Sequence, residues 1–138
     1  MSEAYPTPSW DSVLASTHGM GVLVHGAYEA GAPNADTIID FQFSDDREIQ
    51  GGDVSAWVGV AGDRITMGVY DPSSGTPVEV RRLATNVALP ANKIYTLRVG
   101  YSMTLPAGAI FRIIYTSVGV TAPEITANIL TWLQGTGV

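Results

Sequence analysis

Two histidines are the side chains of this sequence best suited by type to act as a general base or a metal ligand. His18 and His25 lie seven residues apart, and neither is followed by another histidine at the spacing of a metal-binding pair. The chain has no cysteine and no Gly-x-Ser-x-Gly segment, so nothing in it suggests a thiolate or an elbow-type serine nucleophile. We therefore expect structural or surface roles for both histidines.

Acidic residues between positions 36 and 53 are the second candidate for chemistry. Carboxylates at close spacing can bind calcium, but the alternating ligands and central glycine of a calcium loop are absent. A glycosidase needs two carboxylates that face each other across a cleft, and with thirteen acids in the chain some pair arises by chance. We interpret residues 44–53 as a solvated acidic loop closed by Gly51-Gly52, and predict no enzyme, no metal and no cofactor. The acids concerned are Asp36, Asp40, Asp45, Asp46, Glu48 and Asp53.

Four aromatic residues could serve a different chemistry, the stacking of sugar rings. Trp57, Trp132, Tyr70 and Tyr115 all fall in segments that look like strands. Aromatic residues on strands more often belong to the core than to a binding platform. Both interpretations stay open at this point.

The elements that would position these residues are β-strands, because apolar and polar residues alternate along most of the chain. Alternation is clearest from Tyr95 to Met103 and from Phe111 to Tyr115, on either side of the turn Leu105-Pro106-Ala107-Gly108, and predicts two antiparallel strands. Residues 54–60 and 65–69 predict a hairpin around Gly62-Asp63 with a type II′ turn.

Further strands are expected over residues 21–29, 37–43 and 78–81. The first is apolar on both faces, which indicates burial on two sides or inside a subunit contact. In the second, Ile39, Phe41 and Phe43 point one way and Asp40 and Gln42 the other.

Residues 121–134 fit two structures. Ile125, Ile129 and Leu133 recur every four residues, and Thr121 with Glu124 could cap a helix. The same segment alternates as a strand and is rich in β-formers. We favour a strand that closes an edge of the sheet.

These segments predict an all-β fold, an antiparallel β-sandwich of about eight strands that is jelly-roll-like. Residues 18–138 would form this single domain, and residues 1–17 an extended N-terminal arm, because proline favours extended backbone. Trp10 in that arm should dock on a surface, either on its own domain or on a neighbouring subunit.

Composition excludes several partners. The 138 residues carry a net charge of −6 with seven Lys plus Arg, so no basic stripe is available for nucleic acid. Residues 1–6 lack a secretory signal, and no apolar run is long enough to span a membrane. We expect synthesis in a cytoplasm and no membrane partner.

Charged residues make up 14% of the chain against about 25% in typical domains, so much of the surface is neutral and is a candidate for contact with other chains.

Taken together, a short, cysteine-free, acidic β-domain with low charge and a proline-rich arm resembles the small virion proteins of tailed bacteriophages. It looks most like the capsid decoration, or cement, proteins, and the phrases Leu105 to Arg112 and Thr126 to Trp132 have the look of phage head and tail β-modules. The resemblance implies a non-enzymatic structural protein of the virion that forms trimers and binds the major capsid protein or another virion protein. We expect the arm to make that contact, through Tyr5, Pro6, Pro8 and Trp10.

An alternative function belongs to another class. A carbohydrate- or receptor-binding β-sandwich of a phage tail or fibre would expose aromatic residues near polar turns, with Trp57 and Trp132 as the first candidates. A hydrolase on a jelly roll would need convergent acids in a concave site, and it ranks last.

Overall fold

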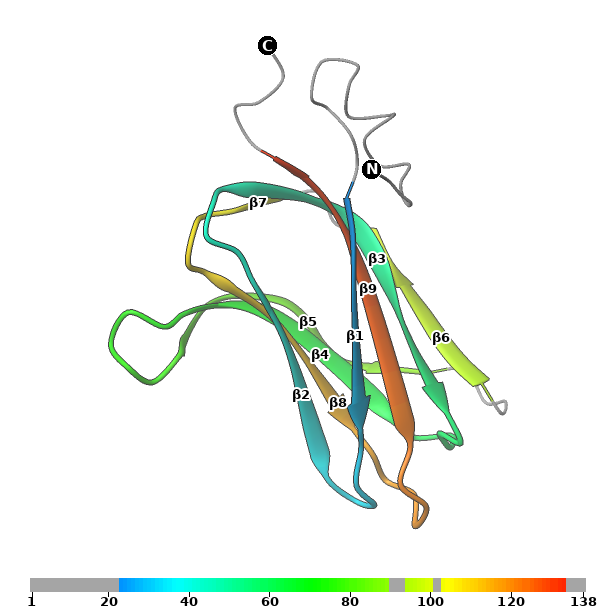
Figure 1. Ribbon diagram of the computed structural model, residues 1–138. Coiled ribbons are helices and arrows are strands. Elements are labelled where there is room, and N and C mark those ends of the chain that lie inside the picture. The colour runs from blue at the N-terminus through cyan, green and yellow to red at the C-terminus, as the bar shows by residue number, and fades with distance from the viewer. Residues whose placement is uncertain (1–22, 90–93, 101–102, 134–138) are drawn as a thin grey trace.

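The computed structural model describes residues 23–89, 94–100 and 103–133, and in this part of the chain every regular element is a strand. No helix there has the length and apolar character needed to cross a membrane. The nine strands are β1 (Leu23–Ala30), β2 (Asp36–Gln42), β3 (Arg47–Trp57), β4 (Arg64–Asp71), β5 (Val78–Ala88), β6 (Ile94–Val99), β7 (Met103–Leu105), β8 (Ile110–Thr116) and β9 (Glu124–Leu133) (Figure 1).

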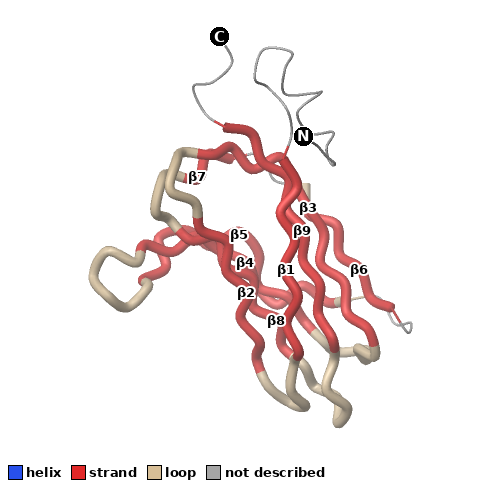
Figure 2. Tube along the Cα trace, viewed as in Figure 1, coloured by secondary structure: helices blue, strands red, loops and turns tan. Residues whose placement is uncertain are grey.

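The strands form two antiparallel sheets that face each other (Figure 2). Sheet A has the order β1-β9-β3-β6, with β7 also paired to β3, and sheet B has the order β2-β8-β4-β5. Strands β6 and β7 pair with successive parts of β3, at 52–57 and 47–49, so together they occupy one strand position. Eight strand positions in this order are those of a jelly roll, as the sequence predicts.

The core lies between the sheets and follows the alternation seen in the sequence. Ile39 lies opposite Ile113, and Phe41 opposite Phe111, in the pairing of β2 with β8. All four are at most 6% exposed, so one face of sheet B is buried. Sheet A contributes Ile49, Val54, Ala56, Ile125, Ala127 and Ile129 to the same core.

The sequence predicts two pairs of antiparallel strands, each around a turn, and both predictions are wrong because the strands before and after each turn do not pair with each other. The turn at Gly62-Asp63 leads from sheet A to sheet B, and so does the turn after Leu105. Alternation and turn residues show that the chain reverses, but burial of both inner faces decides which sheet the next strand joins. The turn type also differs, because Gly62, with φ of 101°, is the third residue of a turn in which Asp63 N donates to Val60 O at 3.1 Å.

The predicted acidic loop at residues 44–53 is wrong from Arg47 onward, where β3 begins. Gly51 has φ of 138° and lies at a register shift in the β3–β9 pairing, as in a β-bulge. At Gly52 a Cβ atom would come within 2.1 Å of the Asn128 carbonyl oxygen. These glycines therefore allow two strands to approach closely, whereas the sequence pattern suggested a loop.

The segment 121–134 contains a strand, β9, as we favoured over a helix. It does not close an edge, however, since it lies between β1 and β3 inside sheet A. Strand β1 is at the edge instead. Its side chains Val24 and Tyr28 are 64% and 58% exposed, so the predicted burial on two sides is wrong within one chain, and the subunit contact stays a prediction.

Candidate interaction surface at one end of the sandwich

Three loops meet at one end of the sandwich, and we call this end the loop tip (Figure 1). They are residues 31–35 between β1 and β2, residues 58–63 between β3 and β4, and residues 117–123 between β8 and β9. Asp63 is the one charged residue in these three loops, and it is only 1% exposed. The three loops therefore present a surface without charge.

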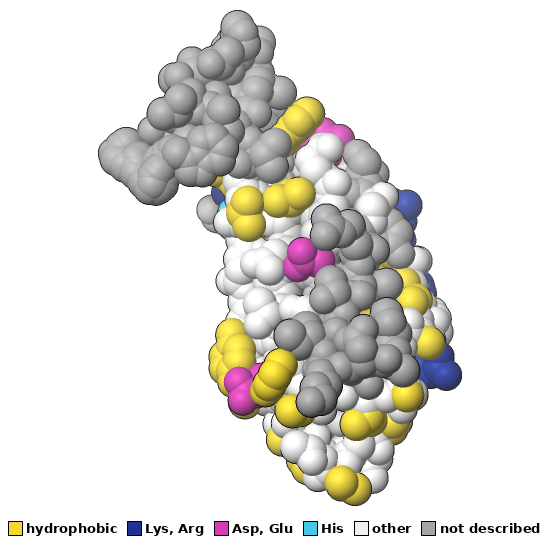
Figure 3. All heavy atoms as spheres, turned by 90° about the vertical axis from the view of Figure 1, so that its right-hand side faces the viewer, with side chains coloured by type: hydrophobic (Ala, Val, Ile, Leu, Met, Phe, Trp, Pro, Cys, Tyr) yellow, Lys and Arg dark blue, Asp and Glu magenta, His cyan; other side chains and the backbone are white. Residues whose placement is uncertain are grey.

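Apolar side chains project from the loop tip. Val120 is 89% exposed, Val118 46% and Val58 36%, and Trp57 at the end of β3 is 51% exposed. Hydrophobic side chains are visible at this lower end in Figure 3. Val58 also has φ of 55°, a conformation that is strained for a β-branched residue and that gathers at functional sites. Such a surface is typical of a protein contact.

The buried carboxylate of Asp63 fastens two of the three loops. It accepts hydrogen bonds from the Tyr115 hydroxyl, from Val60 N at 3.1 Å and from Val118 N at 2.9 Å. Three donors compensate the burial of this charge. In the sequence Asp63 resembles a turn residue, and no local pattern distinguishes it from the exposed acids.

Backbone hydrogen bonds tie the third loop, residues 31–35, to the loop at residues 117–123. Gly31 N donates to Pro123 O at 2.8 Å, and Asn34 N donates to Gly119 O at 3.1 Å. Ser117 N donates to Ala35 O at 2.9 Å. The loop tip is thus held in one shape before any partner arrives, which lowers the entropy cost of binding.

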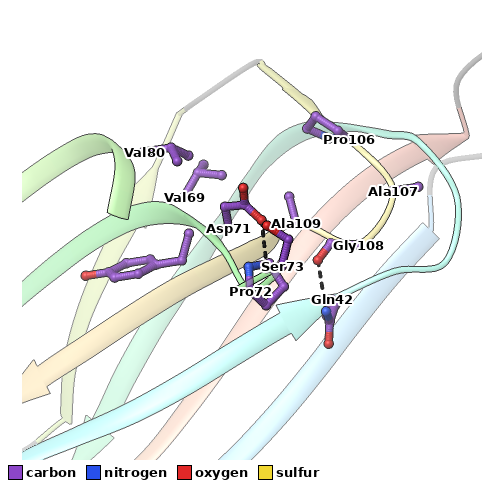
Figure 4. A pocket seen from close by; sticks show the side chains of 11 residues that line it. Gln42, Val69, Asp71, Pro72, Ser73, Val80, Pro106, Ala107, Gly108 and Ala109 are labelled. Atoms are coloured by element: carbon purple, nitrogen blue, oxygen red, sulfur yellow. Dashed lines mark hydrogen bonds between the residues drawn. The ribbon is translucent and has the colours of Figure 1, made fainter. Parts of the chain in front are cut away.

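A hollow of about 560 Å³ lies at the other end of sheet B, where β2 and β4 end and β8 begins (Figure 4). Gln42 holds one wall by donating from Nε2 to Gly108 O at 2.9 Å. Asp71 accepts a hydrogen bond from Ser73 N at 2.9 Å, and this bond lowers the pKa of Asp71. The lining is otherwise largely apolar and includes Val69, Tyr70, Pro72, Val80, Pro106 and Ala109.

Two pairs of oppositely charged side chains lie on the outer face of sheet B. Arg112 binds Asp40 at 2.8 Å, and its guanidinium carbon lies 4.6 Å from the centre of the Tyr70 ring. Arg82 binds Glu79 at 2.6 Å, which lowers the pKa of Glu79. Since these groups satisfy one another, we do not take this face as the interaction surface.

His25 lies in a polar cluster between β1, β3 and β9, whereas His18 lies outside the described residues. His25 Nε2 is 2.9 Å from Thr131 Oγ1, and Arg47 Nη1 donates to the same hydroxyl at 3.3 Å. Partial burial, and then the charge of Arg47, lower the pKa of His25. A histidine beside a hydroxyl has the form of a base and nucleophile, but Thr131 is 0% exposed, so a substrate has no access to it.

The acids from the sequence analysis are dispersed, each with its own contact. Asp45 binds Arg47 at 2.7 Å, and Asp46 accepts from Ala107 N at 2.8 Å. Within residues 23–89, 94–100 and 103–133, no three His, Asp or Glu side chains gather to hold a metal ion. The remaining contacts are Asp36 with the Thr116 hydroxyl at 2.7 Å and Asp53 with Asn128 Nδ2 at 3.2 Å.

The four aromatic residues do not form a platform. Tyr115 is buried in the core, and Tyr70 lines the hollow on sheet B. Trp57 lies opposite Glu124 and Trp132 lies opposite Glu48, which places the two tryptophans at opposite ends of the β3–β9 pair. Trp57 alone is more than half exposed among these four.

Tyr5, Pro6, Pro8 and Trp10, the residues that we predict to contact a partner, lie outside the described residues. Their role stays a prediction. The loop tip and the hollow were not predicted at all, because each is built from residues far apart in sequence.

No protein-family model and no curated protein matches the chain. A VP2 subviral particle of infectious bursal disease virus matches 84% of this chain with 14% identity and a TM-score of 0.48, and the Gt strain of that virus matches 84% with 16% identity and 0.47. A pre-peptidase C-terminal domain of collagenase from Bacillus anthracis matches 78% of this chain and 89% of its own length, with 10% identity and 0.40.

The chain spans only about a third of the length of the viral chains, 34% and 32% respectively. At these identities the likeness concerns the arrangement of strands and nothing beyond it. The chain is an all-β, antiparallel sandwich protein on the evidence of its own strand pairing.

Proposed function

We propose that this chain is a non-enzymatic structural protein of a virion, a capsid decoration protein that binds the assembled head lattice. The loop tip is the observation that supports this most, because a rigid, apolar and uncharged surface is stabilised when another chain covers it. Jelly rolls form viral capsid domains, lectin domains and cupins. That fold analogy permits the proposal without deciding it.

The mechanism is mechanical. A protein that binds the assembled lattice but not its free subunits stabilises the lattice by mass action. We propose that residues 1–17, with Tyr5, Pro6, Pro8 and Trp10, lie across a neighbouring capsid subunit, since proline-rich segments are already extended before they bind. The partner is the major capsid protein or another virion protein, and the chain joins the virion after synthesis in the host cytoplasm.

Sedimentation with empty heads of the phage that encodes the chain tests this proposal. The full chain should sediment with the heads and saturate at a fixed number of copies per head. A variant that lacks residues 1–12 should stay in the supernatant while its circular dichroism spectrum is unchanged. Absence of saturable binding by the full chain would overturn the proposal.

A carbohydrate- or receptor-binding module of a phage tail or fibre is the second candidate, favoured by one observation. Trp57 exposes half of its surface on the outer face of sheet A, and exposed aromatic faces bind sugars. Glycan-array binding that is lost in Trp57→Ala would support this function. Trp132→Ala serves as the control, because Trp132 lies at the other end of the sheet.

A further inference from the structure

A pocket of about 410 Å³ lies on the outer face of sheet A, and we call it the sheet A pocket. Asn128 and Leu130 line it. Along β9 they alternate with the buried Ala127 and Ile129, which places the pocket on the side away from the core. We propose that the sheet A pocket binds an uncharged sugar residue. The inference goes beyond the proposed function, because a capsid contact through the arm and the loop tip does not use this face.

Glycines leave the sheet A pocket open on a face that otherwise carries side chains. In the register of the sheet, Gly26 lies opposite Asn128 and Gly51 lies opposite Leu130. A Cβ atom at Gly26 would lie 2.9 Å from Asn128 Oδ1, so a side chain there would cover that oxygen. Nothing lies within 4 Å of the Cβ position of Gly100, which also lines the pocket. The lack of side chains at these glycines therefore gives a ligand access to polar groups of the sheet.

Gln50 brings an unused hydrogen-bond donor to the sheet A pocket. It lies between Ile49 and Gly51, at the register shift in the β3–β9 pairing, and bulges of this kind redirect side chains. Its Nε2 atom is buried, and the part of the chain that the structure describes provides no acceptor for it. A buried amide without a partner costs free energy. Such a group in a native protein is explained by an acceptor from outside the chain, which is a water molecule or a ligand.

Hydrogen-bond acceptors line the same pocket. Asp53 Oδ1 accepts from Asn128 Nδ2 at 3.2 Å, and this bond holds the carboxylate and the amide in one orientation. A carboxylate offers about four acceptor positions, so Asp53 can accept from further donors. Arg98 is the partner of Asp53 in the β3–β6 register, so this row of the sheet carries one residue of each sign. The pocket therefore favours a ligand without net charge.

A sugar ring has the groups that the sheet A pocket lacks. A hydroxyl both donates and accepts, so neighbouring hydroxyls of one ring can accept from Gln50 and donate to Asp53. Val24, which is 64% exposed, and Leu130 provide apolar surface for the C–H face of the ring. The volume falls in the range of small-ligand sites, roughly 300–1,000 Å³. An acidic sugar is disfavoured by the net charge of −6.

A glycan array with neutral and sialylated oligosaccharides, probed with the full chain, tests the inference. The wild type should bind at least one neutral glycan, and calorimetry with that glycan then gives its Kd. Gly100→Leu should weaken binding by about tenfold or more, because the new side chain occupies the pocket while nothing near Gly100 has to move. Asp53→Asn should weaken binding by about tenfold, since the charged acceptor is lost. Ala122→Leu, which adds the same side chain at the exposed loop tip, should bind like the wild type.

Gln50→Met distinguishes a ligand contact from a structural contact. The variant should bind the glycan more weakly than the wild type, because the amide donor is absent. Its unfolding midpoint should not decrease, since an apolar side chain of similar length replaces a buried donor that has no partner. A lower midpoint would show that the amide stabilises the fold itself and would overturn its assignment to the ligand.

Trp57→Ala separates this site from the exposed tryptophan. Trp57 lies four positions after Asp53 on β3, about 13 Å along the strand, so Trp57→Ala should keep the wild-type Kd. Binding that is lost in Trp57→Ala and kept in Gly100→Leu would overturn the inference, and so would an array on which the wild type binds no neutral glycan.

Head binding is measured separately by sedimentation, in which Gly100→Leu should behave like the wild type. A wild-type chain that binds heads but no neutral glycan would overturn the sugar site and leave the proposed function standing. Glycan binding without head binding would do the reverse.

Discussion

At the scale of single residues, Asp63 does the most to shape the loop tip. Its carboxylate is buried and accepts hydrogen bonds from Tyr115, Val60 and Val118. A buried charge is tolerated when several donors surround it, and removal of the acceptor leaves those donors unpaired. The residue thus connects the stability of the fold with the shape of its apolar end.

Asp63→Ala should lower the free energy of unfolding by about 3 kcal/mol, because the buried Tyr115 hydroxyl and two partly buried backbone N–H groups lose their carboxylate acceptor. Tyr115→Phe removes one donor and should cost about 1.5 kcal/mol. The exposed Glu29→Ala should change stability by less than about 0.5 kcal/mol. Urea unfolding measures all three, and an Asp63→Ala loss no larger than that of Glu29→Ala would contradict the account.

His25 predicts a pH dependence of stability. Its pKa in the folded protein lies below the ordinary value of 6.5, because burial and Arg47 disfavour the cation, while Asp45 opposes this only in part. As the pH falls below about 6.5, the unfolded chain takes up the proton first. The free energy of unfolding should therefore decrease until His25 in the folded protein is protonated as well. At still lower pH, His25 should contribute no further change.

Substitution of His25 isolates that contribution. His25→Gln keeps a group that can accept from the Thr131 hydroxyl but does not titrate. As the pH falls from about 7.5 to about 5.5, the unfolding midpoint of the wild type should decrease relative to that of His25→Gln. A difference that stays constant over this range would show that the pKa of His25 is not lowered.

At the scale of elements, alternation located the strands and missed their partners. Ile39 and Phe41 were assigned to one face of a strand, and both are buried, because the period of two is local information. The pairing of β3 with β9 brings together residues that are 67 to 86 positions apart, and no short pattern encodes it. For the same reason the loop tip and the hollow, each assembled from separate segments, could not be predicted from the sequence.

Gly52 is one residue whose role depends on this pairing. In the sequence Gly51-Gly52 resembles a loop, whereas in the structure Gly52 lies where β3 approaches β9 closely. Gly52→Ala should lower the free energy of unfolding by about 3 kcal/mol, because the new Cβ would meet the Asn128 backbone at 2.1 Å. Gly100→Ala is the matched control, as nothing lies within 4 Å of its Cβ position. Equal unfolding midpoints for the two variants would contradict the close approach of β3 and β9.

At the scale of the whole molecule, charge is distributed unevenly. Ion pairs occupy the outer face of sheet B, whereas the loops of the tip expose no charge. The low charge of the sequence predicted a neutral surface somewhere, and the jelly-roll strand order determines where it lies. Composition does not predict the position of the neutral surface, because it carries no information about which loops meet.

The thermal stability of empty phage heads tests the central claim most directly, since a decoration protein acts by stabilising the lattice. Calorimetry of heads with a saturating amount of the full chain should show disruption at a higher temperature than heads alone. Heads mixed with the variant that lacks residues 1–12 should behave like heads alone. An unchanged disruption temperature with the full chain bound would contradict the account and direct attention to Trp57 and sugar binding.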